Sequence, residues 1–329
     1  MICLLVDYIM NIVFFGSSDY CLPILETLLV SFNLTAVVTK PDQPIGRKQE
    51  LLPTKVKLFS IKNHIPFFTP KDKISLSTLS GNLNDLNPDI FIVADYGLII
   101  PKNIIELPKY KTLNIHFSKL PLLRGPSPVQ YSILSGEESA WISYMLMDEK
   151  MDTGMILSQT EEKLEGNETT DRLYRKLFNK ASSELTDVIN RYVSNELKPQ
   201  KQKSIKATYT KLLKREDGFI SWQLLFCAIK GKVPDGNLIL NWSLSKYFSI
   251  KFCTLRFTQC FERALRALSP WPGIWTTVQI IDNDQQTTKR LKILKAHIES
   301  ETVLILDIVQ LEGKKPVSWK QFCQGYPIL

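Results

Sequence analysis

Hydrophobic residues in the first 150 positions come in short runs that alternate with amphipathic or turn-rich stretches. The runs predict strands at 11–15, 34–39, 88–94, 112–117 and 141–147, with helices between them, such as one at 20–30. Continuous apolar runs separated by helices are typical of a parallel sheet that is covered on both faces. We therefore predict a doubly wound, mostly parallel α/β domain, whose ligands bind at the carboxyl ends of the strands.

The second half of the chain changes its pattern twice. Apolar residues recur at a helical period over 169–197, which predicts a long helix along one edge of the domain. Residues 198–206 are polar and Lys-rich without any period, which predicts a linker. Alternating or apolar runs at 274–280, 290–296 and 302–308 then indicate strands, and a small OB-like β-barrel is the economical fold for them. The expected domains are 10–197 and 207–329.

The distribution of charge along the chain indicates a polyanion as a candidate partner. The 329 residues are 44% hydrophobic and 22% charged, which are ordinary values for a globular chain of two domains. The net charge of +8 is uneven, because residues 1–200 contain 21 Lys and Arg against 23 Asp and Glu, whereas residues 201–329 contain 20 against 10. The basic C-terminal part predicts a nucleic-acid partner, and a generally basic proteome is the competing explanation.

The cysteines and the N-terminus bear on the compartment. Six cysteines are scattered without the spacing of metal ligands, so we expect free thiols in a reducing cytoplasm and no metal site. The apolar opening lacks the basic start and cleavage site of a signal peptide and is shorter than the ~20 residues of a membrane span. We expect no membrane association and take Met10 as the natural start.

The candidate chemistry gathers between residues 112 and 130. On a strand at 112–117, Asn114 and His116 are two residues apart and share a face, and a loop rich in Pro and Gly follows. A lone histidine at a strand end is more often structural than catalytic. The neighbouring amide and the loop, at the edge where α/β sheets bind ligands, favour a catalytic histidine here.

A carboxylate follows the next strand. Asp148 is interpreted as a solvated turn residue, whereas Asp152 precedes Thr-Gly at a sharp turn that can hold it against the imidazole. With no serine or cysteine nucleophile beside them, these groups indicate direct transfer, in which an amine attacks an activated carbonyl. Asn114 and protonated His116 would donate hydrogen bonds to the oxyanion, and Asp152 would keep the imidazole cationic and relay a proton.

These motifs resemble the methionyl-tRNA formyltransferase family, one of the folate-dependent formyltransferases, from about Met10 to the end. The pattern is Asn-x-His, a Ser-Leu-Leu-Pro-like turn, Arg-Gly and Asp-Thr-Gly, here Asn114, His116, 118–121, 124–125 and 152–154. The resemblance implies a Rossmann-like domain, a catalytic trio of Asn114, His116 and Asp152, and 10-formyltetrahydrofolate as formyl donor. The residues implied to border the folate are Ser118, Lys119, Leu120, Pro121, Tyr96, Gly97 and Leu98. Lys119 replaces the usual leucine, which we expect to be tolerated because contacts there are partly to main chain.

The trio does not identify the acceptor of the formyl group, because formyltransferases that act on sugar nucleotides, glycinamide ribotide or water share it. Other segments of the sequence indicate the acceptor. The resemblance implies a basic loop at 40–57 that contacts tRNA through Arg47, and phosphate contacts from Lys314 and Lys315. It thereby implies initiator methionyl-tRNA as partner, a role in translation initiation, and a cytoplasmic monomer. We assign Trp271 and Trp275 to core packing. Residues 223–262 depart from the family and are interpreted as an extra hairpin or an unrelated insertion.

Two alternatives remain open at this point. The same chemistry on an amino-sugar nucleotide is one, although a small acceptor does not require an extended basic surface. A non-catalytic RNA-binding module is the other, and it predicts a damaged trio, whereas all three residues are present.

Overall fold

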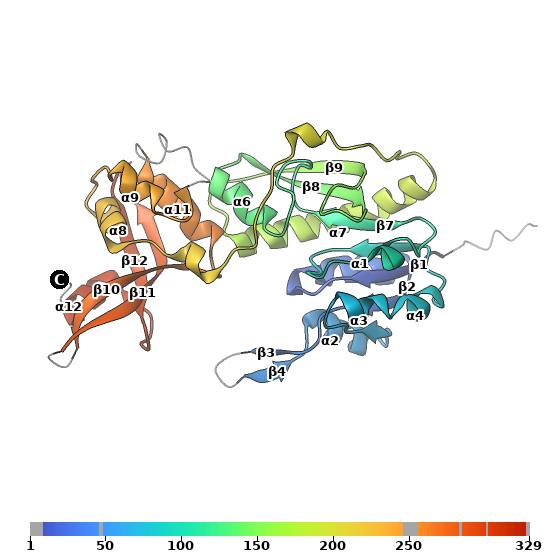
Figure 1. Ribbon diagram of the computed structural model, residues 1–329, viewed down its shortest axis with the longest axis horizontal. Coiled ribbons are helices and arrows are strands. Elements are labelled where there is room, and N and C mark those ends of the chain that lie inside the picture. Colours follow the sequence, from blue (N-terminus) through green and yellow to red (C-terminus); the bar gives the residue numbers. More distant parts are fainter. Residues whose placement is uncertain (1–8, 46–48, 246–255, 283–284, 301, 327–329) are drawn as a thin grey trace, which may run out of the picture. The chain divides into compact units, whose positions relative to one another are not determined.

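The computed structural model describes residues 9–45, 49–245, 256–282, 285–300 and 302–326, and these form two compact units (Figure 1). Unit 1 comprises the described residues of Met1–Pro126, Ala140–Glu162 and Tyr174–Thr210, and unit 2 those of Ser127–Ser139, Lys163–Leu173 and Lys211–Leu329. The segments 127–139 and 163–173 therefore group with the C-terminal residues. The stretch expected as a linker, 198–206, belongs to unit 1.

Unit 1 is built on a seven-stranded sheet in the order β5-β2-β1-β6-β7-β8-β9. Its strands are β1 (Asn11–Phe15), β2 (Asn33–Val38), β5 (Phe67–Phe68), β6 (Ile90–Val93), β7 (Thr112–His116), β8 (Ser139–Leu146) and β9 (Ile156–Lys163). From β5 to β7 the neighbours are parallel, and β8 is antiparallel to β7. The mostly parallel sheet predicted from the apolar runs is confirmed.

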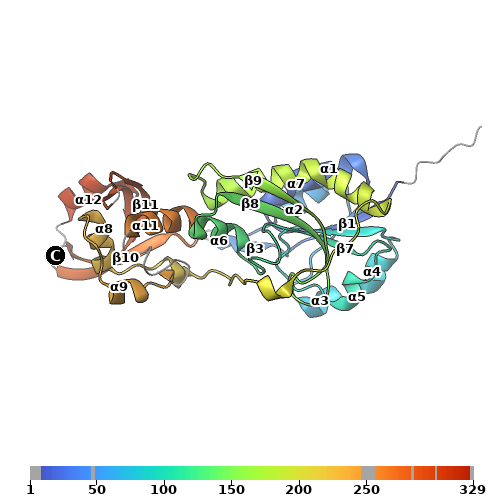
Figure 2. The same cartoon turned by 90° about the horizontal axis from the view of Figure 1, so that it is seen from above.

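Helices cover both faces of this sheet because its central strands are apolar on both sides. One face packs on α3 (Lys73–Ser77), α4 (Ser80–Asn84) and α5 (Lys102–Ile105), which contribute Leu76, Leu83 and Ile104 to a core with β1, β2 and β6. Figure 2 shows α1 (Leu22–Ser31) and α7 (Thr170–Val193) on the opposite face. The predicted long helix is α7, and its apolar stripe is buried at Leu173, Leu177, Ala181, Leu185 and Val188.

The remaining elements of unit 1 are short. They are η1 (Asp19–Cys21), α2 (Lys55–Lys62), η2 (Ser204–Lys206) and a separate antiparallel pair, β3 (Gln43–Ile45) and β4 (Glu50–Leu52). This hairpin lies within the segment 40–57 that the sequence indicated only as a basic loop. The expected helix at 20–30 is divided between η1 and α1.

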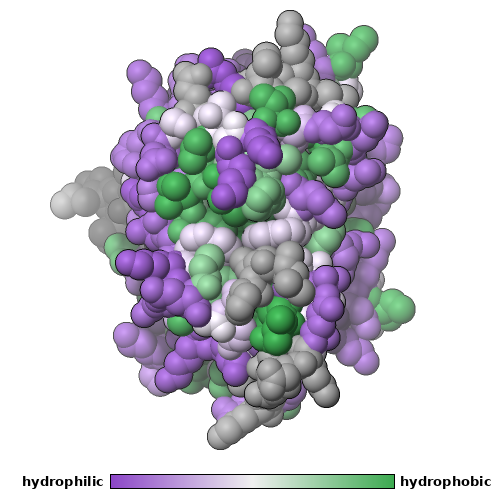
Figure 3. Space-filling view, turned by 90° about the vertical axis from the view of Figure 1, so that its left-hand side faces the viewer, coloured by the Kyte–Doolittle hydropathy of each residue, from purple (hydrophilic) through white to green (hydrophobic). Residues whose placement is uncertain are grey.

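Unit 2 carries a four-stranded antiparallel sheet, in line with the predicted small barrel. The strands are β10 (Ile274–Asp282), β11 (Gln285–Ile298), β12 (Leu304–Leu311) and β13 (Val317–Ser318), paired in that order. Period-two alternation buries Leu304 and Leu306 of β12 and then, after an irregularity in the pairing with β11, Val309 and Leu311. Figure 3 views this end of the chain and shows hydrophilic side chains along its margins, with hydrophobic ones between them.

Helices complete unit 2: α6 (Pro128–Ser135), η3 (Arg215–Gly218), α8 (Trp222–Ile229), α9 (Gly236–Leu240), α11 (Phe257–Ala267) and α12 (Trp319–Gly325). The described part of the unfamiliar segment 223–262 contains helices joined by turns and no strand, so the interpretation as an extra hairpin is wrong for that part. Trp271 is also wrongly assigned to the core, because 58% of its surface is exposed. No helix in the described part of the chain is long and apolar enough to cross a membrane.

Candidate active site

Strand β7 presents the amide and the imidazole on one face of the sheet. All five residues of β7 are buried, and Asn114 and His116 are only 9% and 7% exposed. Asn114 lies opposite Val93 of β6, and His116 lies opposite Ser143 of β8. Within the described residues the Asn114 side chain has no hydrogen-bond partner. Its amide is therefore available to a ligand.

The imidazole of His116 has a polar group at each nitrogen. Nε2 lies 3.1 Å from the carbonyl oxygen of Leu123, which can only accept, so Nε2 carries a proton. Nδ1 lies 3.7 Å from Oδ1 of Asp152. A second proton on Nδ1 would complete an ion pair with this carboxylate. The two groups predicted to act together are thus brought together, although they come from segments 36 positions apart in the sequence.

Asp152 sits at a tight turn that fixes its carboxylate. Its φ of +53° is left-handed, a conformation that residues other than glycine rarely adopt. Oδ2 accepts a hydrogen bond of 2.7 Å from the main-chain N–H of Gly125. At Gly154 a Cβ atom would lie 1.7 Å from the carbonyl oxygen of Leu146, so only glycine fits. Asp148 organises the same turn, accepting from Thr153 Oγ1 at 2.6 Å and from the N–H of Lys150.

The turn 118–121 is anchored to the sheet through its main chain. Ser143 Oγ donates to the Ser118 carbonyl at 2.6 Å and accepts from the Leu120 N–H at 3.2 Å. Gln159 of β9 donates to the Leu120 carbonyl at 3.0 Å. Lys119 is exposed, and its ammonium lies 3.7 Å from the centre of the Trp141 ring, a cation–π contact. The side chain that replaces leucine is thus held on β8.

The segment 96–98 follows β6 at the carboxyl end of the sheet. Tyr96 is buried against Phe15, and burial raises the pKa of its hydroxyl. Ser17 donates to the Tyr96 carbonyl at 3.2 Å. Gly97 has a φ of +82°, and a Cβ there would meet Lys40 at 2.9 Å. The hydrogen bond from Ser17 therefore holds the main chain of this segment, and the positive φ at position 97 favours glycine.

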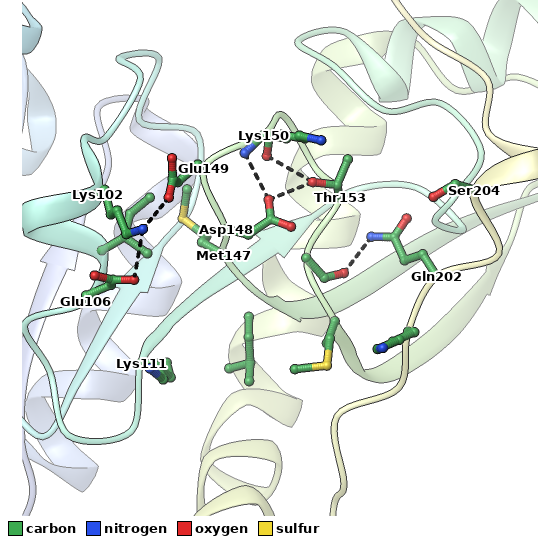
Figure 4. A pocket seen from close by; sticks show the side chains of 15 residues that line it. Lys102, Glu106, Lys111, Met147, Asp148, Glu149, Lys150, Thr153, Gln202 and Ser204 are labelled. Atoms are coloured by element: carbon green, nitrogen blue, oxygen red, sulfur yellow. Dashed lines mark hydrogen bonds and ion pairs between the residues drawn. The ribbon is translucent and has the colours of Figure 1, made fainter.

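A cavity of about 760 Å³ lies beside the turn that carries Asp152 (Figure 4). Its walls include the apolar side chains of Ile105, Leu146, Met147 and Met155, and the polar side chains of Asp148, Glu149 and Thr153. Lys102 hydrogen-bonds to Glu149 at 2.6 Å, which holds the pKa of Glu149 below its usual range and raises that of Lys102. None of the residues that the sequence singled out for folate lines this cavity.

The residues expected to contact tRNA are exposed where they are described. Lys314 and Lys315 lie in the turn between β12 and β13, with both side chains exposed. Arg47 lies outside the described residues. Arg290 of strand β11 is a further basic residue in this unit, and its guanidinium carbon lies 4.9 Å from the centre of the Trp275 ring.

Sequence reasoning missed the support behind the Asp152 turn. Gln202 donates to the carbonyls of Asp152 and Gly154 at 2.9 and 2.7 Å, and accepts from Arg124. Arg124 was singled out only as part of a motif, and Gln202 lies in the stretch interpreted as a linker. No local pattern in the sequence indicates such a contact, because the partners of Gln202 are 48 to 78 positions away.

Comparison with known proteins identifies relatives over nearly the whole chain. Residues 10–189 match the family described as formyl transferase. Methionyl-tRNA formyltransferase of Bacillus mycoides (strain KBAB4) is 38% identical, covering 96% of both chains, and that of Bacillus cytotoxicus is 32% identical, covering 96% of this chain and 95% of the relative. A solved methionyl-tRNA formyltransferase from Clostridium thermocellum has a TM-score of 0.51 at 21% identity, covering 92% of this chain and 98% of that one, and supports the fold.

Proposed function

The chain belongs to the methionyl-tRNA formyltransferase family, and from this premise we propose that it transfers the formyl group of 10-formyltetrahydrofolate to the free amino group of methionine on initiator tRNA. The observation that carries the chemistry is the contact of 3.7 Å between His116 and Asp152, beside the free amide of Asn114. We place the activity in the cytoplasm, where tRNA is charged, and expect the enzyme to act as a monomer.

Hydrogen-bond donors lie close to where negative charge would develop during formyl transfer. The donor molecule supplies an activated formyl carbon, and attack by the methionine amine turns the formyl oxygen into an oxyanion. The Leu123 carbonyl at 3.1 Å marks a place where a carbonyl oxygen can accept from His116 Nε2. We propose that the formyl oxygen accepts from the Asn114 amide, and that it also accepts from His116 Nε2 in place of the Leu123 carbonyl, which must then move away. Fixed donors of this kind stabilise a transition state more than a substrate.

The proton that the attacking amine loses needs an acceptor, and Asp152 is the candidate. The amine forms a bond to carbon and loses a proton, while the nitrogen of the donor leaves carbon and gains one, so the overall exchange is balanced. We propose that Asp152 takes the proton from the amine, directly or through one water, and orients the His116 ring through Nδ1. Its second oxygen is held by the Gly125 N–H, which leaves Oδ1 for this task.

We propose that the formyl donor binds in the space next to this carboxylate. A volume of about 760 Å³ lies within the range of small-ligand sites, and its walls combine apolar side chains with carboxylates and lysines, which offer acceptors and donors to a flat pterin. Thr153 and Gly154 line the cavity and directly follow Asp152. We propose that the pterin occupies this cavity. The segments 96–98 and 118–121 would then hold the part of the folate nearer to His116.

The basic C-terminal part supports a tRNA acceptor. Its excess of ten positive charges over residues 201–329 includes Lys314 and Lys315, which are exposed and free to approach phosphate. We propose that these two lysines and Arg47 contact tRNA. Phosphate contacts release counterions, so affinity for tRNA should fall steeply as salt rises.

The test is a formylation assay with 10-formyltetrahydrofolate and charged initiator tRNA. We expect wild-type enzyme to formylate the tRNA, and His116→Ala to lower turnover by about 10²- to 10⁴-fold, the usual contribution of an acid–base group, with tRNA binding nearly intact. An amino-sugar nucleotide serves as the competing acceptor. Turnover on that compound without tRNA formylation would refute the proposed acceptor, and full turnover by His116→Ala would refute the mechanism.

A further inference from the structure

The turn that carries Asp152 is clamped by one side chain from far along the chain. The Nε2 amide of Gln202 donates to the carbonyls of Asp152, at 2.9 Å, and Gly154, at 2.7 Å. These two carbonyls flank Thr153, so a single amide group spans the turn. Figure 4 shows the Gln202 side chain directed at this turn from the neighbouring segment.

The orientation of the Gln202 amide is set by Arg124. A guanidinium can only donate, and Arg124 donates to Gln202 Oε1 from Nε at 3.1 Å and from Nη2 at 2.7 Å. The oxygen of the amide must therefore face Arg124, and its NH₂ group must face the turn. Arg124 is only 1% exposed, and Tyr209 accepts from its Nη1 at 3.2 Å. The donor end of Gln202 is thus aimed by a buried neighbour.

The turn requires such support, because its backbone is unusual at the reacting residue. Asp152 has a φ of +53°, which persists only where surrounding contacts enforce it. The Gly125 N–H holds one carboxylate oxygen, but it does not fix the main chain on either side. Gln202 fixes that main chain and thereby the distance of 3.7 Å between Asp152 and His116.

We propose that Gln202 is a positioning residue that acts on turnover through Asp152, and that Arg124 fixes the orientation of the Gln202 amide. The inference rests on the proposed function, in which Asp152 handles the proton of the amine. Contacts behind a reacting group commonly set its rate, and a displacement of about 1 Å lowers turnover by about 100-fold.

Gln202→Glu is the decisive variant. The new carboxylate keeps its pairing with Arg124, but it turns an acceptor oxygen toward two carbonyl oxygens and repels the turn. At saturating donor and tRNA we expect kcat to fall by about 10- to 100-fold, while KM for tRNA and the thermal midpoint stay close to wild type. Gln202→Asn is the second variant, for use if Gln202→Glu folds poorly. Its side chain is one methylene too short to span both partners, so kcat should again fall while KM for tRNA and the thermal midpoint stay close to wild type.

A double-mutant cycle separates positioning from general structure. In an Asp152→Asn background, Gln202→Glu should cause no further fall in kcat, because the group it positions is already disabled. Equal falls in both backgrounds, or wild-type kcat for both Gln202 variants, would overturn the inference. Gln200→Ala is the matched control, since Gln200 is exposed and its side chain makes no hydrogen bond within the described residues.

The same cycle distinguishes this inference from the proposed function. If Asp152→Asn keeps wild-type turnover, the assigned chemistry is wrong, and the role of Gln202 falls with it. If Asp152→Asn is inactive and the Gln202 variants are fully active, the chemistry stands and only the positioning role is refuted.

Discussion

Replacing Gly154 by alanine tests how closely turnover depends on the turn around Asp152. The new Cβ would lie 1.7 Å from the Leu146 carbonyl oxygen, and carbon–oxygen contacts normally begin at about 3.3 Å. The turn or the end of β8 must therefore move by roughly 1.6 Å, the difference between these distances. Since a shift of about 1 Å lowers turnover about 100-fold, we expect kcat of Gly154→Ala to fall by at least that factor.

The loss should appear in turnover more strongly than in stability. Overpacking of this kind costs about 1–3 kcal/mol of unfolding free energy, which a loop can partly relieve by moving. Gly81→Ala is the control in the same unit, because Gly81 lies in helix α4 and a Cβ there meets nothing within 4 Å. It should keep wild-type kcat and gain about 0.5–1 kcal/mol. Steady-state formylation and urea unfolding measure both quantities. Wild-type kcat in Gly154→Ala would refute the idea that the position of this turn controls the reaction.

Three further outcomes follow from single contacts. Ser143→Ala removes the hydroxyl that ties Leu120 to the sheet, and we expect a loss of about 1–3 kcal/mol in urea unfolding together with a higher KM for the formyl donor. Burial raises the pKa of Cys21 from 9.0 to about 12, so the folded protein keeps a proton that the unfolded chain loses; its stability should fall as pH rises above 9, and should fall less in Cys21→Ala. Lys314→Ala with Lys315→Ala should raise KM for tRNA but not for the donor, and should flatten the dependence of log KM on log salt by about 0.7–0.9 per lost phosphate contact. An unchanged salt slope would contradict phosphate binding by these lysines.

The central sheet was predictable because its strands are buried on both faces. Strands such as β1 and β6 read as unbroken apolar runs, and burial on both faces is the physical cause of that pattern. Strand β9 was missed because it lies at the sheet edge and buries only Leu157, so its other positions tolerate Gln, Thr and Glu. The hairpin of β3 and β4 was missed for a related reason, since the described side chains of β4 are all exposed.

In the candidate site, too, the features that depend on local sequence were predictable, and those that depend on contacts between distant segments were not. Strand alternation was enough to place Asn114 and His116 on one face, because the period of two is a local property of the backbone. The approach of Asp152 to His116 was expected from a motif, and the structure supplies its causes: the N–H of Gly125, and a glutamine from residue 202. Neither cause leaves a periodic trace, since each joins segments that are distant in the sequence. Side chains that satisfy a strained turn must be polar and need no period, so a polar stretch without a pattern does not by itself distinguish a linker from a segment that supports such a turn.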